Sequence, residues 1–220
     1  MEVLEAIKTR RSIRAYKPDP VPRQAIEKIL DACRYAPSWG NTQCWEIAVL
    51  AGAPLAELKR GIEQRILAGV PDAPHLSRPG FTPKETGRSG DVLEMMQQAQ
   101  GIKREDKEKR LQWRATMGRF FDAPAGIILY MEKYLGLTVL MDIGAMMQTI
   151  ALAAHASGLG TCPEAVVVRY PDLVHQVVGI PESKLLAVGL SLGYPDTNNP
   201  VNKFDRPRLP LDSFVLWRGL

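Results

Sequence analysis

Four short polar segments hold the residues of this chain that could do chemistry. The first and last are rich in arginine, whose planar guanidinium group forms paired hydrogen bonds with phosphate. The middle two offer Gly, Ser, Asn and Gln, whose amide and backbone groups suit the edge of a heterocycle. The segments are RRSIR (Arg10–Arg14), PSWGNTQ (Pro37–Gln43), GTCPEA (Gly160–Ala165) and DRPRLP (Asp205–Pro210). Each alone is an ordinary polar loop, but together they favour a site for a ligand that carries both groups.

Other kinds of site are absent from the sequence. It contains neither GxGxxG opening a helix nor GxxxxGK[ST], and no GxSxG elbow that would present a nucleophilic serine. Three cysteines without a CxxC pair and three scattered histidines predict no metal site and no disulfide framework. We interpret Cys33 as a core residue, and Cys44 and Cys162 as packing residues beside a site. No catalytic side chain and no metal ligand is predicted.

The polar segments fall at the ends of the elements that hydrophobic periodicity predicts. Helices are expected at residues 2–10, 19–36, 53–69, 102–121, 137–160 and 171–179, and strands at 46–52, 124–132, 164–168 and 184–195. Residues 46–52 read as a buried strand. The apolar helix at 137–160 is interrupted by Asp142, Gln148 and His155, so it reads as a buried core helix rather than a membrane span.

Composition favours one domain. The chain has 220 residues, 45% of them hydrophobic, and 28 basic residues oppose 24 acidic ones. This small excess is weak support for a nucleic-acid partner and fits a small anionic ligand. The N-terminus does not resemble a secretory signal, so a cytoplasmic protein is expected.

Two parts depart from the core pattern. Residues 71–122 combine a stretch rich in Pro and Gly, expected to be irregular, with a charged helix, and we predict that they form a lid or insertion. Residues 198–220 are rich in proline and end in an apolar cluster, so this arm is expected to dock on another subunit.

Five ordered motifs give the chain a family resemblance. RRSIRAYKPDPVP, APSWGNTQCWEIAVL, DIGAMMQTIALAAHASGLGTCP, GIPESKLLAVGLSLGYPD and RPRLPLDSF resemble the successive signatures of FMN-dependent nitroreductases. The resemblance implies an α+β fold with a mixed, mainly antiparallel sheet flanked by helices. It also implies an intertwined homodimer with FMN at the interface and a C-terminal arm that crosses to the partner.

The resemblance also implies roles for individual residues. The residues matching FMN-binding positions of the family are Arg10, Arg11, Ser12, Arg14, Pro37, Ser38, Asn41, Gln43, Pro163, Glu164, Ala165, Arg206 and Arg208. Ile13 and Tyr16 would anchor the first loop to the core. Trp39 either shapes the substrate pocket or packs at the interface.

Two positions depart from the family pattern. Arg14 stands where many members have Lys, toward the pyrimidine edge of the flavin. CPEA replaces a sequence with Gly after the acidic residue, so either Glu164 or Ala165 would present its N–H to flavin N5.

The implied activity is transfer of hydride from NADH or NADPH to FMN and then to a small aromatic acceptor, such as a nitroaromatic or a quinone. The chemistry belongs to the flavin, in keeping with the lack of a catalytic dyad. Reductive dehalogenation is a weaker alternative, because the chain has no tyrosine between Tyr35 and Tyr130 to clamp an amino acid. A nucleic-acid-binding module and a flavin carrier without turnover are two further alternatives.

Overall fold

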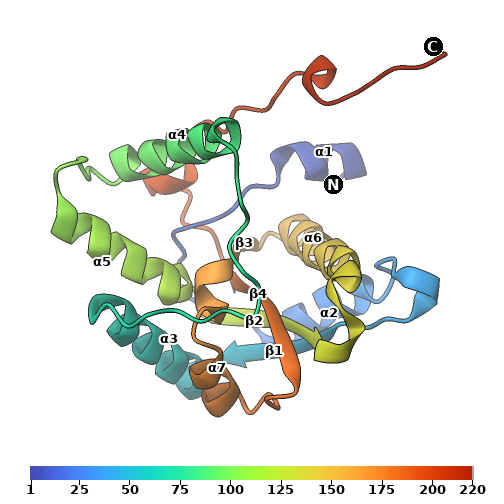
Figure 1. Ribbon diagram of the computed structural model, residues 1–220, viewed down its shortest axis with the longest axis horizontal. Coiled ribbons are helices and arrows are strands. Elements are labelled where there is room, and N and C mark those ends of the chain that lie inside the picture. Colours follow the sequence, from blue (N-terminus) through green and yellow to red (C-terminus); the bar gives the residue numbers. More distant parts are fainter. Residues whose placement is uncertain (220) are drawn as a thin grey trace.

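The computed structural model describes residues 1–219, which form an α+β structure around a four-stranded sheet (Figure 1). The strand order is β1 (Glu46–Ala51), β2 (Ala125–Glu132), β4 (Lys184–Gly193) and β3 (Gly160–Glu164), and all neighbouring pairs are antiparallel. An isolated parallel bridge between Ser12 and Thr161 adds the N-terminal segment beside β3. The expected α+β fold with a mainly antiparallel sheet is therefore confirmed.

Helices cover both faces of this sheet (Figure 1). Helices α2 (Arg23–Cys33) and α6 (Leu140–Ala156) pack on one face, and α3 (Gly52–Leu67) and α7 (Pro171–Val178) lie on the other. The central strand β2 contributes to both layers: Ile127 and Leu129 belong to the core cluster with α2 and α6, and Ile128 to the one with α3. Burial on both faces explains why β2 reads as an unbroken apolar run.

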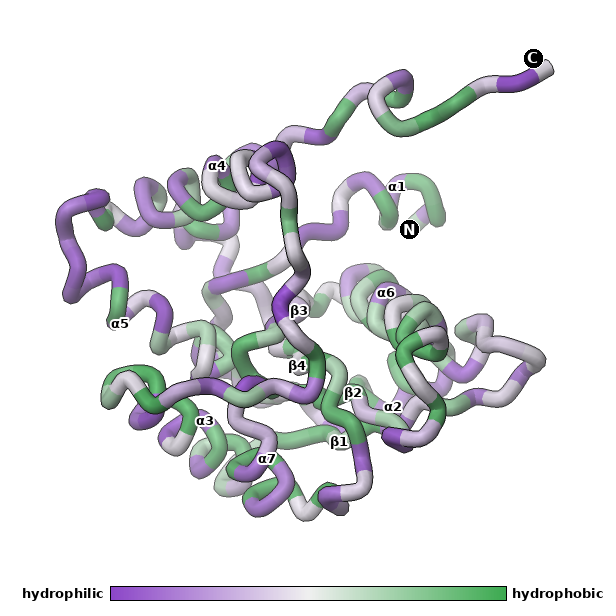
Figure 2. Tube along the Cα trace, in the orientation of Figure 1, coloured by the Kyte–Doolittle hydropathy of each residue, from purple (hydrophilic) through white to green (hydrophobic). Residues whose placement is uncertain are grey.

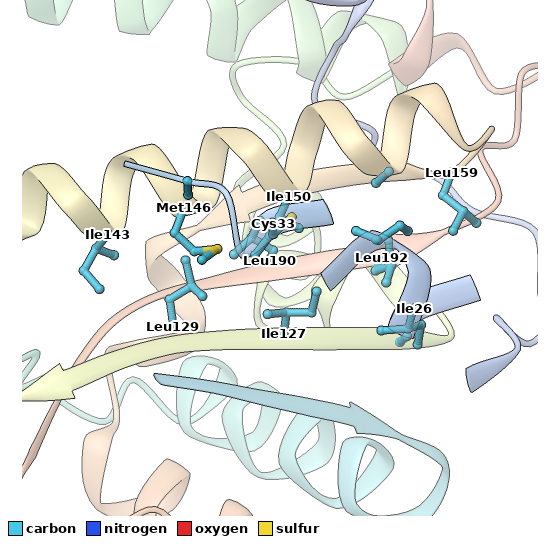
Figure 3. Packing of buried hydrophobic residues seen from close by; sticks show 14 of the residues in the cluster. Ile26, Cys33, Ile127, Leu129, Ile143, Met146, Ile150, Leu159, Leu190 and Leu192 are labelled. Carbon is cyan, nitrogen blue, oxygen red and sulfur yellow. The ribbon is translucent and has the colours of Figure 1, made fainter. Parts of the chain in front are cut away.

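The apolar helix α6 is part of the core. By length and composition alone, residues Leu137–Ala156 could cross a membrane. In the fold, however, Ile143, Met146 and Ile150 are buried toward the sheet (Figure 3). A core helix that packs against a sheet needs this composition, so the apolar run is explained by the fold.

The segment that follows β3 differs from one strand prediction. Residues 164–168 were expected to form a strand, but β3 is Gly160–Glu164 and Ala165–Val168 form a 3₁₀ turn. The turn folds back over β4 at Gly189, where a Cβ atom would lie 2.8 Å from Val167. Valines occur here because the turn is buried, and they do not indicate an extended backbone.

Strand β1 was expected to be buried, but it is an edge strand in which Val49 is 40% exposed.

The predicted insertion contains two helices. Helix α5 (Lys107–Gly118) falls within the expected range, but α4 (Pro83–Ala99) occupies part of the stretch that was expected to be irregular. Thr82 and Glu85 form a capping box at the start of α4, a signal that outweighs the glycines at positions 87 and 90.

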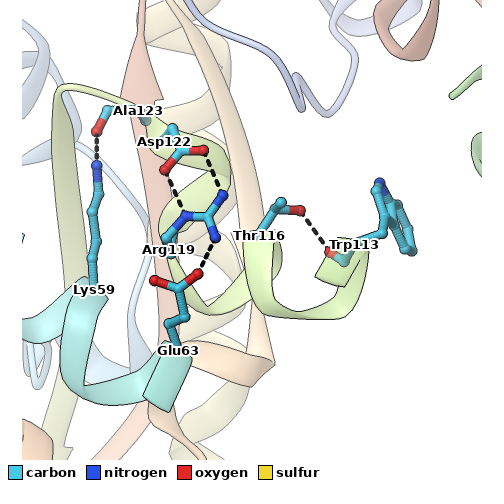
Figure 4. A network of polar contacts seen from close by, with 7 residues as sticks. All are labelled: Lys59, Glu63, Trp113, Thr116, Arg119, Asp122 and Ala123. Atoms are coloured by element: carbon cyan, nitrogen blue, oxygen red, sulfur yellow. Dashed lines mark hydrogen bonds and ion pairs between the residues drawn. The ribbon is translucent and has the colours of Figure 1, made fainter. Parts of the chain in front are cut away.

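The base of the insertion is tied to α3 by a polar network (Figure 4). Arg119, next to the end of α5, pairs with Glu63 of α3 and forms two hydrogen bonds of 2.9 and 3.0 Å with Asp122. Lys59 of α3 donates to the carbonyl of Ala123 at 2.6 Å. These contacts fix α5 relative to the core.

Both chain ends expose apolar side chains. In the view of Figures 1 and 2, helix α1 (Val3–Thr9) and the C-terminal segment both lie toward the upper right, and the tail extends away from the body. Val3 and Leu4 are each 70% exposed, and Leu216 is 76% exposed. Val3 and Leu4 are neighbours on one short helix, and neighbouring exposed apolar side chains are typical of an interaction face.

The close approach of the N-terminal segment to β3 leads to a testable prediction. A Cβ atom at Gly160 would lie 2.5 Å from Cγ1 of Ile13. We expect Gly160→Ala to lower the free energy of unfolding by about 1–3 kcal/mol through overpacking, as measured by urea denaturation. The matched change Gly87→Ala, in α4 with nothing within 4 Å of its Cβ, should be neutral or stabilising. Equal stability of the two variants would contradict the steric argument.

Candidate functional site

The first and last arginine-rich segments lie side by side. The Arg11 side chain donates to the carbonyl of Phe204 at 2.5 Å, and the backbone N–H of Arg14 donates to Oδ1 of Asn202 at 2.8 Å. Asn202 is buried, and its amide nitrogen donates to the carbonyl of Ala15 at 2.8 Å. These bonds hold residues 10–15 against residues 202–206, although nearly the whole chain separates them in sequence.

This contact gathers five guanidinium groups: Arg10, Arg11, Arg14, Arg206 and Arg208. Burial, together with the charges of the other four, lowers the pKa of Arg206 to about 10. Burial and Arg208 also lower the pKa of Arg10. Among residues 1–219, no carboxylate forms an ion pair with any of the five. Such a cluster favours binding of an anion, because an anion would relieve the mutual repulsion.

Two buried nitrogen atoms of this cluster lack hydrogen-bond acceptors. The Nε atoms of Arg10 and Arg206 are buried, and neither has a hydrogen-bond partner. A buried donor without an acceptor costs free energy, so these groups call for an acceptor that protein atoms do not supply. A phosphate has the charge and the several acceptor oxygens that match them. The residues therefore fit the phosphate group of a nucleotide cofactor such as FMN.

The third polar segment lies next to the first through β3. Ile13 is buried, and its N–H donates to the carbonyl of Thr161 at 2.9 Å. The Tyr16 hydroxyl lies 2.9 Å from the carbonyl of Ile13 and 2.7 Å from Oγ of Ser191. Ile13 and Tyr16 thus anchor the arginine loop to the core, as expected from the sequence.

The end of β3 changes abruptly from buried to exposed. Glu164 is 5% exposed, and burial raises the pKa of its carboxyl well above the ordinary value. Ala165, which follows it, is exposed.

Burial raises the pKa of the Cys162 thiol to about 12, so this cysteine is a neutral packing residue rather than a nucleophile. Among the residues that the structure describes, no three His, Cys, Asp or Glu side chains gather as they would around a metal ion.

The remaining polar segment, Pro37–Gln43, is a shaped loop held by α6. Asp142 of α6 is buried, and its Oδ2 accepts hydrogen bonds from the N–H of Trp39 at 3.1 Å and from Sγ of Cys44 at 3.5 Å. Asn41 and Gln43 have positive φ angles of 62° and 49°, so the backbone takes a defined and costly path. The Trp39 side chain is 68% exposed.

Helix α6 separates this loop from the arginine cluster. Asp142 holds the loop near the first turn of α6, whereas Thr9 Oγ1, beside Arg10, lies 2.8 Å from Nε2 of His155 in the last turn. The two positions are 13 residues apart, which corresponds to about 20 Å along a helix that rises about 1.5 Å per residue. A single chain therefore brings together residues 10–16, 160–165 and 202–208, but not residues 37–43.

Two residues important for this geometry were not predicted from the sequence. Asp142 interrupts an apolar helix, which is a usable signal for a buried polar role. Asn202 lies two residues after Pro200 in a largely polar stretch, where nothing distinguishes it from an ordinary turn residue. Its role depends on a contact with residues 14 and 15 that only the folded chain shows.

Comparisons with known proteins show the family of this chain. The profile described as the Nitroreductase family matches residues 7–194. A 4-nitrobenzoate reductase from Pseudomonas putida is 33% identical to this chain over an alignment of 220 positions, which covers 97% of this chain and 94% of that protein. The chain is thus a member of the nitroreductase family.

Two solved structures share the fold closely. The FMN- and NADPH-dependent nitroreductase NfnB from sphigopyxis sp. strain HMH superposes with a TM-score of 0.96 at 30% identity, covering 100% of both chains. The FMN-dependent nitroreductase NfnB from Mycobacterium smegmatis, solved with NADPH, gives a TM-score of 0.92 at 28% identity. It covers 98% of this chain, and the match includes 97% of its own chain.

The Asp142 contact yields a prediction for the loop. Asp142→Ala removes the acceptor of the part-buried Trp39 N–H, a hydrogen bond to a carboxylate that contributes about 1.5–3 kcal/mol. We expect the Trp39 amide to exchange with solvent at least about tenfold faster in hydrogen-exchange measurements. Asp142→Asn keeps an acceptor oxygen and should recover part of the protection. Unchanged exchange in Asp142→Ala would show that the loop does not depend on this contact.

Proposed function

We propose that this chain is an FMN-dependent NAD(P)H oxidoreductase that reduces small aromatic acceptors, such as nitroaromatics or quinones. The observation that carries the proposal is the cluster of five arginines, with the buried and unpaired Nε atoms of Arg10 and Arg206, in a member of the nitroreductase family. Relatives named for reduction of 4-nitrobenzoate and chloronitrobenzene support the acceptor class.

The phosphate end of FMN is assigned to the arginine cluster. Arg10, Arg206 and Arg208 supply charge-assisted donors, and Ser12 adds a hydroxyl beside them. Arg11 has a different part, because its guanidinium group already bonds the carbonyl of Phe204. It holds the C-terminal segment in place and adds positive charge to the site.

The ring of FMN is assigned to the end of β3. When bound, FMN accepts hydride from the nicotinamide and passes it to the second substrate. Arg14 would lie toward the pyrimidine edge; its guanidinium carbon lies 5.9 Å from the centre of the Phe121 ring, which limits its freedom. Pro163 and Glu164 lead into exposed Ala165. Glu164 is the last residue of β3, whereas Ala165 begins the 3₁₀ turn and is exposed, so we assign the N–H for the ring to Ala165.

A homodimer would complete the site. Residues Pro37, Ser38, Asn41 and Gln43, with Trp39, lie about 20 Å along α6 from the arginine cluster of their own chain, so in a dimer they would serve the partner's flavin. The exposed apolar residues of α1 and of the arm at residues 198–220 would be buried by the partner. Residues 71–122 would form the lid of this one domain. Three free cysteines suit a cytoplasmic enzyme.

The proposal is tested by the spectrum and by reduction. The purified protein should be yellow with one FMN per subunit, and an anaerobic addition of NADPH or NADH should bleach it. Added 4-nitrobenzoate should restore the colour. A colourless protein that ignores added FMN in fluorescence quenching would overturn the proposal and leave a nucleic-acid role to examine. A yellow protein that neither donor bleaches would be a flavin carrier.

Arg10 provides a test of the phosphate site. Arg10→Ala removes a charge-assisted donor of about 1.5–3 kcal/mol, so the Kd for FMN should rise by about ten- to a hundredfold in fluorescence titrations. Arg10→Lys should recover only part of this loss, because an ammonium group cannot make a bidentate contact. If Arg10→Ala binds FMN like the wild type, Arg10 does not contact the phosphate.

The arm provides a test of the dimer. Truncation after Pro200 removes Arg206, Arg208 and the apolar side chains Leu211, Phe214, Leu216 and Trp217. Each large side chain buried at an interface contributes about 1.5–3 kcal/mol, so the truncated protein should be monomeric in light scattering and should lose FMN. A flavin-loaded, monodisperse monomer would contradict the proposed role of the arm.

A further inference from the structure

A pocket outside the arginine cluster lies between the insertion and the 3₁₀ turn at Ala165–Val168. Its volume is about 470 Å³, and its apolar lining includes Leu93, Trp113, Met117 and Val166. Trp113 and Val166 are themselves buried, so this part of the lining is fixed by packing. The pocket is large enough for part of an organic ligand.

The charged residues of this pocket all have the same sign. Its lining contains five cationic side chains and no carboxylate: Arg78, Lys107, Arg110, Arg114 and Arg169. Asp72 is the acidic residue paired with this group, at 2.8 Å from Arg78 and 3.4 Å from Arg169. Although Asp72 raises the pKa of Arg169, burial and the charge of Arg78 outweigh it and lower that pKa. One carboxylate against five cations leaves a positive pocket that favours an anionic ligand.

A neighbouring pocket connects this surface with the end of β3. It has a volume of about 490 Å³ and is lined by Ala165, Leu137 and Leu140, together with the same Arg78 and Arg169. The two arginines therefore border both pockets. A ligand with one end near Ala165 could extend past them to Arg110 and Arg114 on α5.

Polar contacts hold α5 in place against the core. Arg119, next to its end, pairs with Glu63 and Asp122, and within α5 the Thr116 hydroxyl donates to the carbonyl of Trp113 at 2.6 Å (Figure 4). Arg110 and Arg114 are one helical turn apart and both line the pocket. Two guanidinium groups fixed in this way can approach one phosphate from the same side.

We propose that this pocket binds the phosphorylated adenosine end of NADPH, with the 2′-phosphate near Arg110, Arg114 and Arg169. The proposal rests on the proposed function, because it places the nicotinamide toward Ala165, where the flavin ring is assigned. A doubly charged phosphate with three terminal oxygens matches several guanidinium groups, whereas a single carboxylate is satisfied by one. The pocket would thereby select NADPH over NADH.

The test compares the two donors in the FMN-loaded enzyme. Arg110→Gln and Arg114→Gln keep good helix-forming residues in α5 and remove one charge each. Each variant should raise the KM for NADPH by about ten- to a hundredfold and leave the KM for NADH nearly unchanged. As a readout independent of turnover, 2′,5′-ADP should bind the wild type at least about tenfold more tightly than 5′-AMP does, and each variant should lose this difference.

The matched control is Arg60→Gln, an exposed arginine of α3 that lines neither pocket and should change none of these values. If the variants oxidise NADPH like the wild type and bind 2′,5′-ADP equally well, the inference fails and the proposed function stands. If instead the KM for 4-nitrobenzoate rises but that for nitrobenzene does not, the pocket serves a carboxylate of the acceptor, and the inference is also overturned. A wild type that oxidises neither donor would refute the proposed function itself.

Discussion

The structure depends on the close contact between residues 12–13 and β3. The contact is possible because Gly160 has no side chain where Ile13 packs, so the backbone can bond to Thr161. It also forces the arginines of the first loop toward those of residues 206 and 208. Within residues 1–219, hydrogen bonds to the backbone and to the Asn202 amide hold these charges together, and no carboxylate pairs with them. An anion in the cluster would add the missing stabilisation, so folding and binding are linked at this point.

Much of this fold could be predicted from the sequence because most of the helices show helical spacing and strands β1, β2 and β4 are strongly apolar. The errors have physical causes. Residues 164–168 read as a strand because valines that are buried in a 3₁₀ turn have the same composition as valines in a sheet. Residues 83–91 were expected to be irregular because of their glycines, but the capping box of Thr82 and Glu85 starts helix α4 there. Edge position, as in β1, depends on strand order, which local pattern does not contain.

The arginine cluster of the candidate site could be predicted from the sequence, but Asp142, Asn202 and the pocket beside α5 could not. Arginine density indicated an anion site, and the contact between residues 10–15 and 202–206 agrees with that interpretation. Asp142 and Asn202 were missed because their roles come from partners more than 90 residues away in the sequence. The pocket beside α5 was also missed. A charged helix most often has a solvated face, and only its packing over Val166 shows that Arg110 and Arg114 face the same pocket as Arg169.

The length of α6 determines how the site can be completed. Because its two ends hold different polar segments, no motion of a loop within one chain can bring residues 37–43 to the arginine cluster without breaking the Asp142 contact. A symmetric pair of chains removes this conflict, since each chain can offer its loop to the other while both helices stay intact. Helix α1, with its exposed apolar residues, contacts α6 and lies at the cluster end of that helix, where the second chain would have to approach. Dimer formation and cofactor binding would then depend on the same surface, and loss of one should accompany loss of the other.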